Sequence, residues 1–131
     1  MSDPAIRAKR PLSPHLQIYK PQISSTLSIL HRITGVAMAI GTLMLVWLLV
    51  AAAIGEHAYD QFMWFAGSPL GLFMLFGWSF ALFYHLCNGV RHLIWDTGRL
   101  FNLSCARKAG IMVVCVAIAM TALTWYCAYN F

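Results

Sequence analysis

The stretch ITGVAMAIGTLMLVWLLVAAAIG, residues 33–55, contains 23 consecutive residues without a charged side chain. A helix of this length rises about 35 Å, which is enough to cross the roughly 30 Å hydrocarbon core of a bilayer. The whole composition agrees, because 60% of the 131 residues are hydrophobic and only 10% are charged. A soluble domain carries about 25% charged residues. We therefore predict an all-α membrane protein.

Two more stretches of the chain are long and apolar enough to span a bilayer. The second begins at Ser68-Pro69, a favourable N-cap followed by proline at the first helical position, and has no formal charge before Arg91. The third, residues 109–131, again has no charged side chain. The predicted transmembrane spans are about 28–55, 69–95 and 109–130, and the first begins near Ser24–Ser25, which can cap it. They form an anchor domain, residues 24–131, after an N-terminal segment, residues 1–23.

Charge predicts the direction of these spans. Segment 1–32 has a net charge of +4 and segment 91–108 one of +3, whereas the connection between them carries only Glu56 and Asp60. The positive-inside rule then places the N-terminus inside, with segment 1–23 cytoplasmic, and the C-terminus outside. Because the basic residues flank apolar blocks and form no stripe, nucleic acid is not a predicted partner. The N-terminal segment resembles neither a signal peptide nor a long transit peptide, so a bacterial inner membrane is favoured over a mitochondrial one.

The first polar cluster is SILHRITG, residues 28–35, at the start of the first span. On a helix, Ser28, His31 and Arg32 share a broad face and can bind an anionic or carbonyl-bearing group. The alternative is that Arg32 only extends to the lipid headgroups as a flanking charge.

The second polar cluster is HLCNGVRHLIWDTG, residues 85–98, at the inner end of the second span. His85, His92 and Asp96 are spaced to lie within about 40° of one another on a helix, and Gly89 beside them leaves room for a flat ligand. A buried neutral imidazole needs a partner, either haem iron or a hydrogen bond across a helix interface. Since the chain lacks a CxxCH motif, any haem is predicted to be non-covalent and b-type. The charges available for its propionates are His31, Arg32, Arg91 and His92.

Together these motifs resemble the cytochrome b membrane-anchor subunit of succinate dehydrogenase, respiratory complex II. The pattern of that family includes an Arg-Pro pair, then S-x-x-H-R-x-[ST], then H-x3-G-x-R-H-x3-D-x-G. The matching positions are Arg10-Pro11; Ser28, His31, Arg32 and Thr34; and His85, Gly89, Arg91, His92, Asp96 and Gly98.

The resemblance implies roles for individual residues. His85 would be one axial ligand of haem b, and a histidine of a small anchor subunit would be the other. His31, Arg32 and His92 would contact the haem propionates, and Ser28 and Arg32 would line a ubiquinone site. From its position we infer that Asp96 could orient His92 or Arg91.

The resemblance also implies an assembly. The three spans would pack with the small membrane-anchor subunit in a haem-holding helical bundle. An iron–sulfur subunit and a flavoprotein subunit, which hold the iron–sulfur clusters and FAD, would deliver electrons from succinate, so the chain alone would not be catalytic. Three alternatives stay open: an anchor of a fumarate reductase that works with quinol, a haem-free structural anchor, and a small transporter or channel subunit.

Overall fold

The computed structural model describes residues 21–99 and 102–130, and these residues form helices and connections only. The helices are α2 (Ile23–Ile54), α3 (Glu56–Ala66), α4 (Pro69–Asp96) and α5 (Leu103–Asn130). Three of them, α2, α4 and α5, are long and apolar enough to cross a membrane. The predicted all-α architecture with three candidate spans is therefore confirmed.

The beginnings of the helices differ in part from the predicted ones. The expected cap of the first span is wrong: Gln22 occupies the N-cap position without a side-chain cap, and Ser24 and Ser25 lie inside the first turn. The cap of the second span is confirmed, because the Ser68 hydroxyl oxygen accepts a hydrogen bond from the Gly71 amide at 3.1 Å. The third helix begins six residues before the predicted boundary at Ala109, so its first turns include charged residues.

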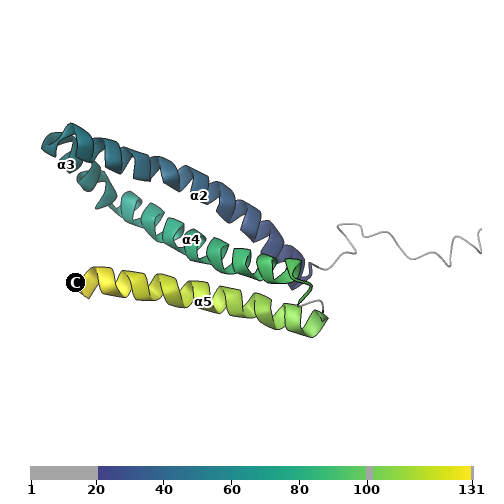
Figure 1. The fold of residues 1–131 in the computed structure, drawn as a ribbon. Coiled ribbons are helices and arrows are strands. Elements are labelled where there is room, and N and C mark those ends of the chain that lie inside the picture. The colour runs from purple at the N-terminus through teal and green to yellow at the C-terminus, as the bar shows by residue number, and fades with distance from the viewer. Residues whose placement is uncertain (1–20, 100–101, 131) are drawn as a thin grey trace, which may run out of the picture.

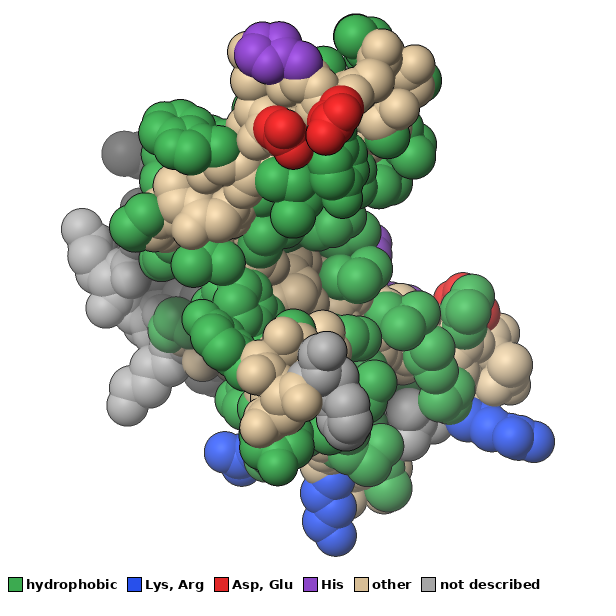
Figure 2. Space-filling view, turned by 90° about the vertical axis from the view of Figure 1, so that its left-hand side faces the viewer, with side chains coloured by type: hydrophobic (Ala, Val, Ile, Leu, Met, Phe, Trp, Pro, Cys, Tyr) green, Lys and Arg blue, Asp and Glu red, His purple; other side chains and the backbone are tan. Residues whose placement is uncertain are grey.

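The three long helices run side by side, with α4 drawn between α2 and α5 in Figure 1, and α2 also contacts α5 directly. Their common core is small and consists of Leu27 from α2, Tyr84 from α4, and Val113 and Ala117 from α5. Most other large apolar side chains remain exposed (Figure 2). Such a surface suits a chain whose surroundings are lipid and other membrane helices rather than water.

The connection between the first two spans contains a helix, α3, that we did not predict. Its residues Phe62 and Ala66 are buried against Ala51 of α2, and the Trp47 ring meets Phe62 edge-on at 5.1 Å. Acidic side chains gather over this end of the molecule (Figure 2). Helix α3 thus covers the turn from α2 into α4, at the end opposite the predicted polar clusters.

We expect Gly41→Ala to destabilise the packing of α2 on α4. A Cβ atom at Gly41 would overlap the indole of Trp78, and overpacking of this kind costs about 1–3 kcal/mol. Thermal unfolding of the purified protein should therefore occur at a lower temperature. The matched control is Gly77→Ala on α4, where an added Cβ meets no atom of this chain within 4 Å. Equal destabilisation of both variants would contradict the packing argument.

Candidate functional site

Three histidines from two helices meet at the end of the molecule where α2 begins and α4 ends. His31 of α2 stacks on His85 of α4, with ring centroids 3.9 Å apart and ring planes only 11° from parallel. His92, two turns further along α4, lies 5.2 Å from His31 between ring centroids. The structure therefore brings together three of the residues that the sequence motifs singled out.

The hydrogen bonds of His85 determine which of its ring nitrogens is free. Its Nδ1 lies 3.1 Å from the backbone carbonyl oxygen of His31, which can only accept, so Nδ1 carries the proton. The Thr34 hydroxyl lies 3.2 Å from the same nitrogen and directs its own hydrogen to a backbone carbonyl, that of Leu30 or His31. In neutral His85 the lone pair is consequently on Nε2. Metal-binding histidines commonly have this arrangement, with the other ring N–H held by a carbonyl.

One glycine allows the two helices to approach closely at this site. A Cβ atom on Gly35 of α2 would lie 3.2 Å from Cε1 of His85, which is tighter than ordinary contact. A Cβ atom on Gly89 of α4 would lie 3.9 Å from Cε1 of His31, which is an ordinary contact. His31 Nδ1 is buried, and within the described chain it has no hydrogen-bond partner. The free Nε2 of His85 and the unpartnered Nδ1 of His31 together fit a group that needs both a metal ligand and a polar contact, as haem does.

Within the described residues, no hydrogen bond or ion pair joins Ser28, Arg32 or Asp96 to the histidines. Ser28 is half-buried and Arg32 is exposed, and within residues 21–99 and 102–130 Arg32 makes no hydrogen bond or ion pair. Asp96 is also exposed, and no described interaction joins it to His92 or Arg91. The structure therefore gives no support to our inference that Asp96 orients one of these neighbours.

Arg91 does not face the histidines, contrary to its place among the charges available for haem propionates. Its guanidinium lies 4.0 Å from the centre of the Trp95 ring, and its Nη1 donates to Oδ1 of Asn88 at 3.1 Å. A Cβ atom on Gly110 of α5 would be 3.9 Å from Nη2 of Arg91, so the Arg91 side chain reaches toward α5. The reason is helical phase, because Arg91 is about 120° around α4 from His85.

Two residues that sequence reasoning missed hold α2 and α4 together here. The Tyr84 hydroxyl is buried and donates to the backbone carbonyl of Leu27 at 2.8 Å. Thr34 contacts His85 as described. Thr34 was part of the quoted motif, although no role was assigned to it; for Tyr84 the only available signal was a polar group directly before His85 in an apolar block.

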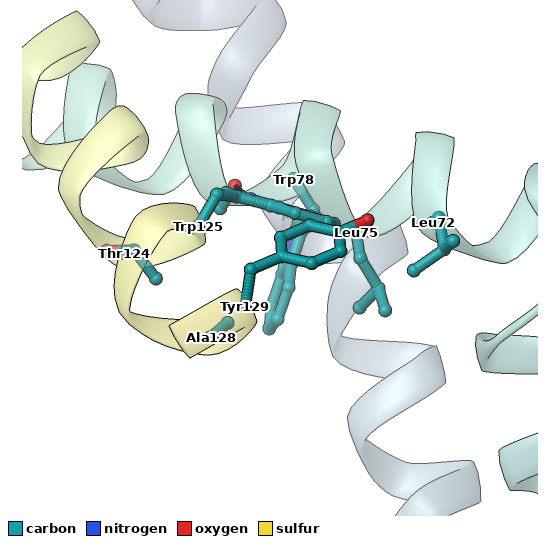
Figure 3. A pocket seen from close by; sticks show the side chains of 8 residues that line it. Leu72, Leu75, Trp78, Thr124, Trp125, Ala128 and Tyr129 are labelled. Atoms are coloured by element: carbon teal, nitrogen blue, oxygen red, sulfur yellow. Dashed lines mark hydrogen bonds between the residues drawn. The ribbon is translucent and has the colours of Figure 1, made fainter. Parts of the chain in front are cut away.

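A separate groove of about 580 Å³ lies between α4 and α5, near the C-terminal end of α5 (Figure 3). It is lined by Leu72, Leu75, Trp78, Ser79, Thr124, Trp125, Ala128 and Tyr129. The Trp125 indole N–H donates to the Ser79 hydroxyl at 3.0 Å and links the two helices. The lining is mainly aromatic and aliphatic and contains no histidine, cysteine or carboxylate, so this groove does not offer the metal-binding side chains that the histidine end has.

Known proteins resemble this chain over most of its length. The family model described as succinate dehydrogenase/fumarate reductase transmembrane subunit matches residues 6–124. The succinate dehydrogenase cytochrome b556 subunit of Rickettsia felis is 48% identical, over 89% of this chain and 91% of the relative. The subunit of the same name from Paracoccus denitrificans is 38% identical, over 90% and 91%. The cytochrome b560 subunit from Marchantia polymorpha is 42% identical, over 86% of each chain.

Proposed function

The chain belongs to the succinate dehydrogenase/fumarate reductase transmembrane subunit family, and from this premise we propose that it is the cytochrome b anchor of a succinate:quinone oxidoreductase. In this role it binds haem b, helps to form the ubiquinone site and holds the hydrophilic subunits at the membrane. The chemistry then belongs to the assembled complex, to which this chain contributes ligands and hydrogen-bond donors.

We assign His85 as an axial ligand of haem b. The support is the His85 Nδ1–H bond to the His31 carbonyl, which leaves Nε2 available for iron. The second iron ligand must be a residue other than His31 or His92. His31 is stacked face to face on His85 and His92 lies on the same helix as His85, so neither would be placed to hold the same iron together with His85. A histidine of the small anchor subunit would complete the site.

We assign the haem propionates to His31, His92 and Arg32. His31 has a buried ring nitrogen without a partner in the described chain, and His92 is adjacent to it. Arg32 follows His31 directly and is exposed at the same end of α2. When bound, haem supplies one-electron chemistry, and these side chains would hold its charged edge toward the inner membrane surface.

We assign Ser28 and Arg32 to the ubiquinone site. Ubiquinone takes up two electrons and two protons, and negative charge develops on its oxygens before the protons arrive. A guanidinium stabilises that charge, and a hydroxyl can hydrogen-bond a carbonyl oxygen. Ser28 and Arg32 are one turn apart on α2 and carry the required groups. The iron–sulfur subunit would dock at this end of the molecule, next to the site.

The proposed orientation follows from charge. Among the described residues, the histidine end carries one carboxylate, Asp96, and five cations: Arg32, Arg91, Arg99, Arg107 and Lys108. Glu56 and Asp60 lie on α3 at the other end. The positive-inside rule then places the histidines on the inner side of a bacterial inner membrane and the C-terminus outside. The small anchor subunit would cover the exposed apolar faces of the helices, with lipid around the pair.

The single observation that carries the haem assignment is the orientation of His85, and a spectrum tests it. We expect the detergent-purified complex to show a b-type α-band in a dithionite-reduced minus oxidised difference spectrum, with haem b recovered as pyridine haemochrome. An intact, succinate-oxidising complex without haem would overturn the assignment and leave a haem-free anchor. Quinone reduction by that complex would then be measured separately.

A further inference from the structure

Arg91 is a buried cation without a matching anion in the described chain. Arg91 is only 3% exposed, and its Nε and Nη2 atoms have no hydrogen-bond partner among the described residues. Its one hydrogen bond goes to Asn88, a neutral side chain that is fully buried. Buried charges are normally paired with an opposite charge, because moving a charge from water into the protein interior costs free energy.

The described carboxylates are too far away or too exposed to compensate Arg91. Glu56 and Asp60 belong to α3, at the opposite end of α4. Asp96 is exposed, and the described residues contain no ion pair in which it takes part. Arg91 also differs from Arg107 and Lys108, which are exposed on α5 and therefore screened by solvent. Its positive field acts through the protein interior.

That field reaches the site of His85. The two residues are six positions apart on α4, which corresponds to about 9 Å along the helix axis. Arg91 points toward α5, so it does not contact a group bound at His85. Its effect on such a group would be electrostatic, through the body of helix α4. Haem iron becomes less positive when it takes up one electron. A nearby fixed cation in a medium of low dielectric constant therefore favours the reduced state.

We propose that the buried positive charge of Arg91 raises the reduction potential of the haem held by His85. This inference rests on the proposed function, because it requires haem at His85. The lack of a carboxylate beside Arg91 among residues 21–99 and 102–130 is then a functional property, since a pairing anion would cancel the field. Asn88 holds the guanidinium in place without neutralising it.

The experiment is a spectroelectrochemical titration of haem b in the assembled complex with Asn88→Asp. Aspartate has nearly the shape of asparagine and would place a carboxylate where Oδ1 already lies 3.1 Å from Arg91 Nη1. We expect the oxidised-to-reduced ratio at a fixed potential to rise on the order of tenfold, which is a fall in midpoint of about 59 mV for one electron. An unchanged midpoint with haem retained would overturn the proposal.

Two further variants separate charge from packing. Arg91→Lys keeps the charge but loses the planar contacts, and should leave the midpoint close to that of the parent. Lys108→Gln removes an exposed cation near the same end and should also have little effect. A fall in the midpoint of Arg91→Lys equal to that in Asn88→Asp would overturn the proposal. A parent complex without a haem spectrum would instead refute the proposed function.

Discussion

Replacing His85 with alanine is expected to abolish binding of haem b in the assembled complex. Loss of a group that only orients a metal ligand costs about 10- to 100-fold in affinity, and loss of the ligand itself should exceed this. The substitution also removes the ring that stacks on His31. The measurement is the ratio of pyridine haemochrome to protein after purification.

The matched control for His85→Ala is His57→Ala on α3. His57 is exposed, and its described hydrogen bond is to Gln61 one turn away. This variant should keep the full haem content and the parental spectrum. A complex that contains His85→Ala, retains its subunits and shows an unchanged haem spectrum would contradict the axial-ligand assignment.

Arg32→Leu is expected to lower succinate–quinone reductase activity by about 10²- to 10³-fold, the typical cost of removing one stabilising charge donor. Reduction of a soluble dye by succinate should be spared, because those electrons leave from the hydrophilic subunits. Arg32 is exposed and makes no described hydrogen bond or ion pair, so its loss should not unfold the chain. Both activities are measured on the same preparation.

Three further variants test whether the charge of Arg32 and the hydroxyl of Ser28 act in quinone reduction. Arg32→Lys keeps the charge without the planar fork and should be intermediate. Ser28→Ala removes one hydrogen bond, worth about 0.5–1.5 kcal/mol, and should lower quinone reduction severalfold. Lys108→Leu removes an exposed cation of α5 and should change neither activity. If Arg32→Leu lowered quinone and dye reduction in parallel, the defect would lie in assembly and the quinone assignment would fail.

The membrane spans could be predicted because hydropathy is a local property of the sequence. Runs without charge, such as residues 33–55, report directly on burial in lipid, and the Ser68-Pro69 pair marks a helix start by its own chemistry. Helix α3 was missed because its charged and polar residues were interpreted only as a connection. Its apolar residues Phe62 and Ala66, four positions apart, carried the signal of an amphipathic helix.

The site was predictable in membership but not in geometry. Spacing and the family motifs singled out His31, His85 and His92, which the structure brings together. Their hydrogen bonds depend on how α2 crosses α4, and no local pattern encodes that crossing. The direction of Arg91 is a similar case, because its neighbour Gly110 is 19 positions away on another helix. The haem and quinone roles of all these residues remain predictions.

The acceptor for His85 Nδ1 is the main-chain carbonyl of residue 31, which every amino acid possesses. The tautomer of His85 is therefore set by how closely α2 and α4 cross at Gly35, and not by the side chain at position 31. Homologous chains could exchange the residue at position 31 and still present Nε2 in the same protonation form. A larger residue at position 35 would press on the His85 ring and weaken the hydrogen bond that keeps the proton on Nδ1. Gly35, which has no side-chain chemistry of its own, would then be needed to keep Nε2 of His85 available to a metal.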